Sequence, residues 1–164
     1  MWSRRGAVAL ASAVAVTVVL AGCGFAPVYG AGGDGLRGAV RAEAPDTDET
    51  FAFVRRFEER LGRPEAPRYD LAYTLSTTQD ALAIDRSDNV TRLTIEGQLA
   101  WRLVPQGGGA AVLSGNEIAF TSYSAPDSTI ATFASRRDAD RRLAIILADK
   151  VVTRLLGSAS ALAR

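Results

Sequence analysis

The sequence contains no histidine and only one cysteine, Cys23. Without histidine the chain cannot form a Ser-His-Asp or Cys-His catalytic group, nor a zinc site of the usual Cys/His kind. A single cysteine also excludes a disulfide within the chain. Carboxylates alone could still serve a hydrolase, but no pair of acids has a recognisable catalytic arrangement. We therefore expect a binding protein that is not an enzyme and that uses no metal or cofactor.

The sequence also lacks an excess of charge of either sign, with 19 Lys and Arg against 18 Asp and Glu. Arg4 and Arg5 are the only charged residues before Cys23, so the chain that follows is slightly acidic. Nucleic-acid-binding proteins usually carry a strongly basic surface. We therefore expect no nucleic-acid partner.

The first 22 residues have the layout of a bacterial lipoprotein signal peptide. Arg4 and Arg5 form a short basic start, and an apolar run then extends from Ala7 to Ala21. This run is too short to cross a bilayer comfortably and ends in small residues, which favours a removable signal over a membrane helix. The small residues before Cys23 match those that a lipoprotein signal peptidase accepts. The alternative is an ordinary secretory signal followed by a free cysteine.

Cleavage would make Cys23 the first residue of the mature protein, with acyl chains on its sulfur and its amine. Each buried methylene contributes about 0.8 kcal/mol, so several acyl chains anchor a protein stably. Gly24 stands where an aspartate would retain a bacterial lipoprotein at the inner membrane. We therefore expect a lipid-anchored protein on the periplasmic face of the outer membrane.

Composition divides the rest of the chain into three parts. Residues 23–35 are rich in glycine and predict a lipidated tether. Residues 36–157 carry the patterned segments and are long enough for a single domain with a core. Residues 158–164 are small and weakly patterned, which predicts a disordered tail.

A short strand over residues 36–44 and a helix after it are predicted at the start of the domain. Thr47 or Asp48 can cap the helix, and Gly62 ends it. Its predicted apolar face recurs at steps of three and four residues. The residues of this face are Phe51, Val54, Phe57 and Leu61.

Three strands are predicted next, near residues 70–76, 92–103 and 111–123, the last containing Ile118 and Phe120. The middle strand alternates strictly, which indicates one buried face and one exposed or partner-facing face. Its apolar face consists of Leu93, Ile95, Gly97, Leu99, Trp101 and Leu103. Its other face consists of Arg92, Thr94, Glu96, Gln98, Ala100 and Arg102.

A long helix over residues 135–156, ended by Gly157, is predicted last. At 100° per residue its apolar arc consists of Ala144, Leu147, Ala148, Val151, Val152 and Leu155. Leu143 and Ile146 fall near the polar side, so we expect both to be partly exposed. The element order β-α-β-β-β-α predicts an α+β fold, a two-layer sandwich of about four mainly antiparallel strands packed with two helices.

Short segments in this order resemble the lipopolysaccharide-assembly lipoprotein family LptE, in its alphaproteobacterial form. The residues that carry the resemblance are 23–30, Thr91–Arg92, Ser122–Tyr123, 128–132 and 137–139. The resemblance covers nearly all of the mature chain and is carried by the order and spacing of these segments together. One departure is Ser124, where relatives often carry asparagine.

The resemblance implies an α/β sandwich with a four-stranded sheet and a non-catalytic role in the lipopolysaccharide translocon of the outer membrane. Such a lipoprotein is similar to a plug inside the β-barrel LptD, where it assists assembly of the barrel and delivery of lipopolysaccharide to the cell surface. The alternative is a generic outer-membrane lipoprotein that scaffolds another envelope complex for lipid transport or secretion.

Four residues are candidate contacts with lipopolysaccharide or with the barrel. Arg86, Arg92 and Arg102 carry guanidinium groups, which bind the phosphates and acidic sugars of lipopolysaccharide well. The alternative for each of them, which charged residues favour in general, is an ordinary solvated surface arginine. Tyr123 precedes a proline-containing loop and could contact the barrel wall or pack at the end of its strand.

The arginines of the last helix favour a simpler interpretation. Arg136 lies four residues before Asp140, and Asp138 lies four residues before Arg142. Such pairs stabilise a helix by roughly 0.2–0.5 kcal/mol each. We therefore expect an ion-paired surface here, and no phosphate site.

Overall fold

The computed structural model describes residues 35–84, 90–125 and 129–162. The predictions for the signal peptide, for the acylated Cys23, for most of the tether and for Arg86 lie outside these residues. Among the described residues, no helix is both long enough and apolar enough to cross a membrane.

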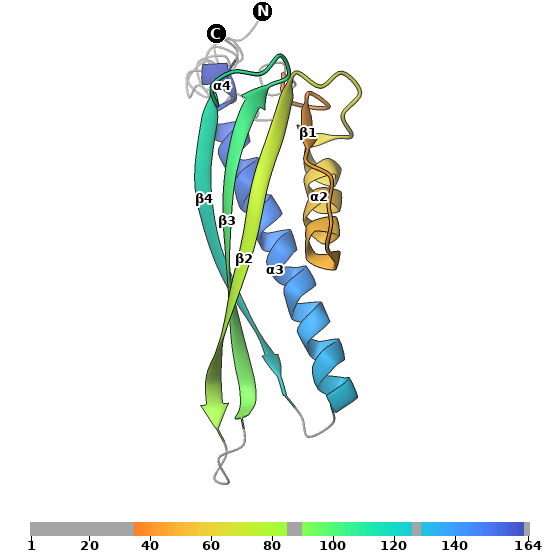
Figure 1. Cartoon of the computed structure of the whole chain (residues 1–164), viewed down its shortest axis with the longest axis vertical. Helices are drawn as coiled ribbons and strands as arrows, with labels where there is room; N and C mark the ends of the chain where they lie inside the picture. Colours follow the sequence, from red (N-terminus) through yellow and green to blue (C-terminus); the bar gives the residue numbers. More distant parts are fainter. Residues whose placement is uncertain (1–34, 85–89, 126–128, 163–164) are drawn as a thin grey trace, which may run out of the picture.

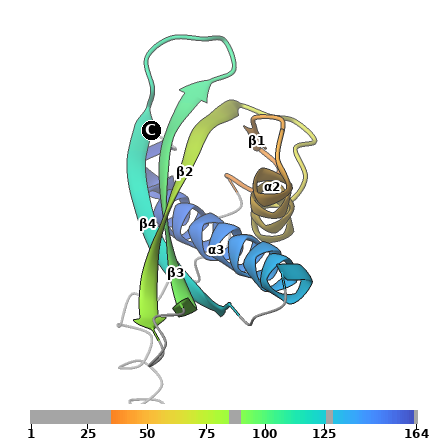
Figure 2. The same cartoon turned by 60° about the horizontal axis from the view of Figure 1, so that its bottom comes forward.

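The chain folds into one sheet with both long helices on one side of it (Figures 1 and 2). The elements in order are β1 (Val40–Ala42), α2 (Asp48–Leu61), β2 (Tyr69–Ile84), β3 (Val90–Pro105), β4 (Leu113–Ser124), α3 (Thr129–Gly157) and α4 (Ala159–Leu162). The strand order is β1-β2-β3-β4, with β1 parallel to β2 and the other pairs antiparallel. The predicted α+β class and element order are confirmed.

The alternation in β3 has the predicted effect. Ile95, Leu99 and Leu103 face the helices and are buried, while Arg92 and Arg102 on the other face are exposed. In β2, which pairs with β3, Leu71 is fully buried. The core therefore lies between the sheet and the helices, and no described helix covers the second face of the sheet, which we call the open face.

The helix α3 lies against β3 at Gly97. A Cβ atom on Gly97 would come within 2.8 Å of Leu143 Cδ2, so the leucine fills the space that this glycine leaves. Our expectation that Leu143 is partly exposed was wrong, because this close approach widens the buried arc of the helix and leaves Leu143 only 1% exposed. Ile146 is 39% exposed, as expected.

The helix α2 is capped as predicted but rotated from the predicted face. The Thr47 hydroxyl accepts a hydrogen bond from the Thr50 amide at 3.3 Å, and Gly62 follows the last turn. Phe51, placed in the apolar face by the sequence, is 60% exposed. Phe53 is buried instead and contacts the Tyr73 ring at 4.7 Å between centroids, because the stripe that packs on the sheet runs in steps of four residues from Phe53.

The two ends of the domain also differ from the prediction. The strand β1 spans only Val40–Ala42, and α3 begins at Thr129, six residues before the predicted start. The segment after Gly157, where we expected a disordered tail, contains α4. It is held because Ala159 is buried and the Tyr69 hydroxyl donates to the carbonyl of Leu162 at 3.3 Å.

Candidate functional site

The open face of the sheet is the first candidate surface. Even-numbered side chains of β2, β3 and β4 lie on it, and register pairs them in rows such as Thr78, Glu96 and Phe120. Most of these side chains are uncharged and have hydroxyl or amide groups that can form hydrogen bonds. They include Thr74, Ser76, Thr78, Thr94, Gln98, Ser114, Asn116 and Ser122. The arrangement suits contact with another polar surface more than it suits catalysis.

Two of the predicted arginines lie on this open face, at opposite ends. Arg92 Nε donates to Ser122 Oγ at 3.3 Å, while Arg102 pairs in register with Ala72 on one side and Ser114 on the other. Ten residues of strand separate the two by about 33 Å. The structure therefore places them on one face but does not bring them together around one ligand.

Tyr123 lies on the helix side of the sheet. It is 6% exposed, and its hydroxyl donates to Gln79 Oε1 at 3.2 Å. Of the two interpretations given above, packing at the end of the strand is the one that this geometry supports. Little of the Tyr123 side chain is left exposed for contact with another protein.

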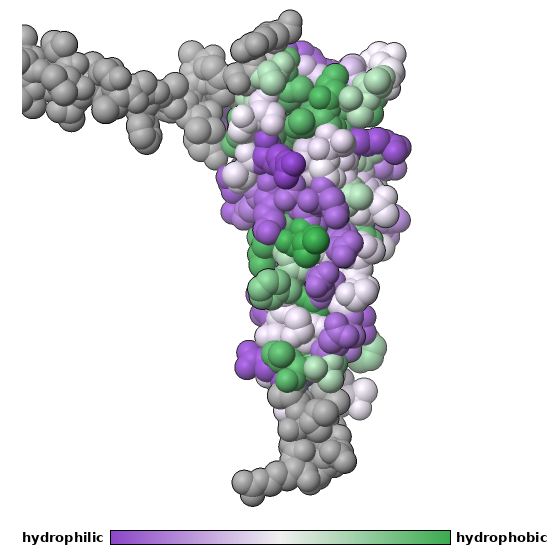
Figure 3. Space-filling view, turned by 90° about the vertical axis from the view of Figure 1, so that its left-hand side faces the viewer, coloured by the Kyte–Doolittle hydropathy of each residue, from purple (hydrophilic) through white to green (hydrophobic). Residues whose placement is uncertain are grey.

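An apolar pair interrupts the polar face at β4. Ile118 is 46% exposed and Phe120 is 74% exposed, and the two side chains point the same way. In the view of Figure 3, apolar patches alternate with hydrophilic ones along the molecule. The sequence placed both residues in this strand, but strand alternation alone did not say which face was buried.

The edge of the sheet at β4 is covered by cations from α3. Arg142 Nη2 donates to the carbonyl of Ser122 at 3.1 Å, and Lys150 Nζ donates to the carbonyl of Ile118 at 2.7 Å. These carbonyls point away from β3 and would otherwise be free to pair with another strand. The sequence analysis predicted only the ion pair of Arg142 with Asp138, and it revealed neither of these contacts with the sheet.

The opposite edge, at β2, is covered only at its start. The strand β1 pairs with Tyr69, Asp70 and Leu71, and the last contact is the Glu43 amide donating to the Leu71 carbonyl at 2.9 Å. The chain then leaves the sheet towards α2. Within the described part of the chain, no strand pairs with this side of β2 beyond Leu71.

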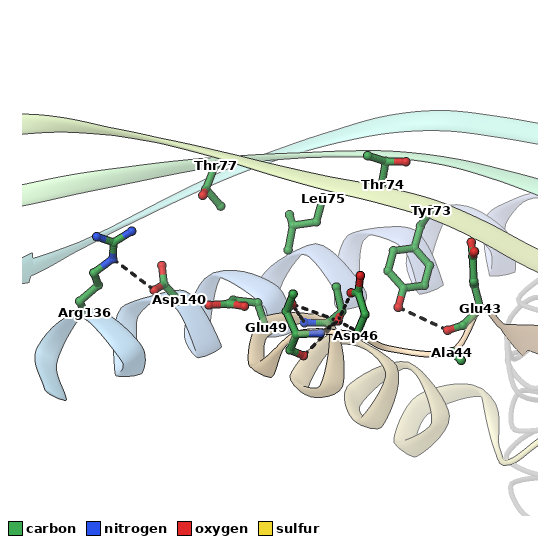
Figure 4. Close-up of a pocket in the computed structure, with 12 residues that line it drawn as sticks. Glu43, Ala44, Asp46, Glu49, Tyr73, Thr74, Leu75, Thr77, Arg136 and Asp140 are labelled. Atoms are coloured by element: carbon green, nitrogen blue, oxygen red, sulfur yellow. Dashed lines mark hydrogen bonds and ion pairs between the residues drawn. The ribbon is translucent and has the colours of Figure 1, made fainter. Parts of the chain in front are cut away.

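A hollow of about 460 Å³ lies beside this uncovered edge (Figure 4). It opens between β2, the first turn of α2 and the first half of α3. Its lining residues are Glu43, Ala44, Asp46, Thr47, Glu49, Thr50, Tyr73, Thr74, Leu75, Thr77, Arg136 and Asp140. Four of these side chains are acidic and one is basic, so the hollow carries a negative charge.

Burial, reinforced by neighbouring acids, raises the pKa of two groups in the hollow. Burial raises the pKa of Asp140, an effect that Arg136 opposes from 3.7 Å and that Glu49 reinforces. Burial, together with Asp46 and Glu43, raises the pKa of Tyr73 to about 12. The Tyr73 phenol therefore stays protonated, and its hydroxyl donates to the Glu43 carbonyl at 3.3 Å.

The arginines at the start of α3 are ion-paired, as predicted. Arg136 pairs with Asp140, and Arg142 pairs with Asp138. The sequence missed a third contact, between Arg137 Nη2 and Asp48 Oδ2 of α2 at 2.7 Å. These pairs neutralise the helix surface and leave no free patch of arginines there.

The described residues contain no cluster of three or more His, Cys, Asp or Glu that could hold a metal ion. The acids of the hollow come from a loop, from α2 and from α3, which are far apart in the sequence. The sequence analysis did not single out any of them as a site. The sequence offered only a local indication of this acidic hollow, namely the acids Asp46 and Glu49 on either side of Thr47, which caps α2.

No model of a known protein family matches the sequence, and no curated protein matches it. The fold is similar to that of a candidate lipoprotein from Caulobacter crescentus, with a TM-score of 0.66 and 19% identity over 79% of this chain and 97% of that one. It is similar to rare lipoprotein B from Shewanella oneidensis, with a TM-score of 0.59 and 12% identity over 77% and 98%. It is also similar to a minor lipoprotein from Acinetobacter baumannii, with a TM-score of 0.51 and 12% identity over 73% of this chain and 91% of that one. This chain therefore has a fold that is found in bacterial lipoproteins.

Proposed function

We propose that this protein is a lipid-anchored subunit of the lipopolysaccharide translocon in the outer membrane. In this proposal it is acylated at Cys23, lies on the periplasmic face, and binds inside an LptD-like β-barrel. It assists assembly of that barrel and delivery of lipopolysaccharide to the cell surface. It does so without catalysis and without a cofactor other than its own acyl chains.

The observation that carries the proposal is the open face of the β2–β4 sheet. A domain that folds alone usually hides one sheet face and solvates the other. Here the second face is long, rich in hydroxyl and amide groups, and nearly free of net charge. Such a surface suits the polar interior of a large barrel, which is lined with hydrogen-bonding groups. The fold shared with bacterial lipoproteins and the resemblance of the sequence to the LptE family support the same role.

The test is affinity purification of the full chain, tagged at its C-terminus, from membranes solubilised in detergent. We expect one large β-barrel protein to co-purify in near one-to-one amount, and depletion of the chain to reduce surface lipopolysaccharide. A Cys23→Ala variant is the control for anchoring, and we expect this protein to be absent from the outer-membrane fraction. Recovery of the chain alone, or with inner-membrane proteins, would contradict the proposal. A different partner with normal surface lipopolysaccharide would favour the general scaffold.

The role of the arginines needs a separate test, because the barrel can be bound without any lipopolysaccharide contact. Arg92→Ala and Arg102→Ala are each expected to weaken lipopolysaccharide binding, and the two losses should be independent because the side chains lie far apart. Arg55→Ala is the matched control, since Arg55 is exposed on α2 and away from the open face. If all three variants bind lipopolysaccharide with equal affinity, Arg92 and Arg102 are ordinary surface arginines.

A further inference from the structure

The uncovered edge of β2 carries backbone groups that are ready to pair. Because the Leu71 carbonyl points towards β1, alternation directs the amides and carbonyls of Tyr73, Leu75, Thr77 and Gln79 to the same side. The intervening residues pair with β3; Ser76, for example, lies opposite Gln98. At about 3.3 Å per residue, the stretch 73–79 offers an edge about 20 Å long.

Within residues 35–84, 90–125 and 129–162, this stretch has none of the usual protection of a sheet edge. Native edges are commonly blocked by charged side chains, proline, bulges or a covering element. Residues 73–79 contain no charged residue and no proline, and the register shifts in β2 begin only after Ala81. Among the described residues nothing lies across it in a ladder. An exposed edge of this kind is the usual template for adding a strand from another protein.

The hollow beside the edge indicates the chemistry of the added strand. Side chains of a strand paired to β2 would alternate between the open face and the hollow. Those entering the hollow would meet Glu43, Asp46, Glu49 and Asp140, with Arg136 as the basic residue of the lining. Lysine or arginine at alternate positions would therefore be favoured there, and acidic residues would be repelled.

We propose that residues 73–79 of β2 bind an extended, basic segment of a partner protein as an additional strand of the sheet. The backbone ladder supplies most of the affinity, and the acids of the hollow select lysine or arginine at every second position. This inference does not depend on the partner being a translocon barrel. It would hold for any envelope complex that presents such a segment.

The experiment uses the full mature chain in detergent micelles and a blocked heptapeptide in which lysine alternates with threonine. Peptide addition is followed by NMR of the backbone amides. We expect the amides of Tyr73, Leu75 and Thr77 to shift strongly, while those of Thr74 and Ser76 shift less because they pair with β3. A peptide with glutamate in place of lysine should bind at least tenfold more weakly.

Changes in the peptide backbone and in the protein separate the contribution of backbone hydrogen bonds from that of charge. Two methylated peptides are compared, one methylated at the lysine nitrogens and one at the threonine nitrogens, so that each blocks one edge of the peptide strand. The peptide blocked on the edge that faces β2 should not bind, and this control does not alter the protein. Thr77→Pro removes one edge amide, and its loss should weaken binding by roughly threefold to tenfold. Glu43→Gln with Glu49→Gln should reduce the preference for lysine over glutamate, whereas Glu65→Gln, outside the hollow, should not.

Equal binding of the basic and acidic peptides would overturn the proposal, as would full binding by both of the methylated peptides. Dimerisation of the chain that disappears in Thr77→Pro would also overturn it, by showing that the edge pairs with a second copy. If Thr77→Pro does not fold, the methylated peptide and the glutamine variants still decide the question. Since no barrel is present in this assay, its result is independent of the test of the translocon role.

Discussion

The two edges of one sheet are treated in opposite ways in this molecule. At β4, side chains of α3 bond to outward carbonyls through Arg142 and Lys150. At β2, the covering strand β1 stops after three residues, and an acidic hollow replaces it. The covered edge is protected against pairing, whereas the other keeps its capacity to pair. The position of α3 over β3 and β4 decides which edge is covered.

The largest expected effect follows from removing the side chain that seats α3 on the sheet. Leu143→Ala should lower the free energy of unfolding by about 2–5 kcal/mol, because it opens a cavity at a fully buried site against Gly97. Urea unfolding measures this. Ile146→Ala, three residues later and 39% exposed, is the control and should cost well under half as much. Similar losses in both variants would mean that α3 does not sit on the sheet as described.

A change from the sheet side should displace the same helix by overpacking. Gly97→Ala puts a Cβ atom 2.8 Å from Leu143 Cδ2, so either the leucine or α3 must shift, at a cost of about 1–3 kcal/mol. Gly107→Ala is the matched control, since a Cβ there meets nothing within 4 Å. Urea unfolding of both variants should show a loss only for the first, and a normal stability of Gly97→Ala would contradict the close approach.

Uncovering the protected edge should have a smaller effect on stability and a larger one on association. Lys150→Ala removes the donor to the Ile118 carbonyl, and we expect the free energy of unfolding to fall by about 0.5–1.5 kcal/mol. The freed edge should make the variant self-associate in sedimentation experiments. Arg63 is highly exposed and lies away from β4, so Arg63→Ala should neither lower stability nor cause self-association. A Lys150→Ala protein that stays monomeric would weaken the contrast between the edges.

The smallest expected effect concerns pH and the hollow beside β2. The pKa of Asp140 is raised, so the folded state binds its proton more tightly than the unfolded state does. Stability from this group is therefore present below its ordinary pKa of 3.8 and is lost as pH rises through the raised value. Asp140→Asn should flatten this part of the stability profile in urea titrations across that range. Asp138→Asn, on the ion-paired outer surface, is the control, and an unchanged slope in Asp140→Asn would contradict the assignment.

Regular patterns made the architecture predictable. Strict alternation fixed the buried face of β3, and the arc of α3 from Ala144 to Leu155 is buried as predicted. The failures have local physical causes. Leu143 is buried because Gly97 lets the helix approach, and Phe51 is exposed because α2 packs through Phe53. Neither cause can be read from one segment alone.

The candidate site was less predictable than the fold. Arg92 and Arg102 lie on the open face, as the alternation in β3 required. The hollow depends on where β1 ends and on how α2 and α3 sit beside β2, so its residues share no sequence period. Glu49 and Asp140 are brought together only by packing of the two helices. The contact between Arg137 and Asp48 arises in the same way.

The strand order of the sheet follows the order of the chain, so every strand pairs with a neighbour in sequence. The β2–β3 and β3–β4 pairs are hairpins, and closing such short loops costs little conformational entropy. Only the parallel β1–β2 pair needs a helix between its strands. A topology of this kind is expected to fold quickly for its sheet content, and without a disulfide to guide it.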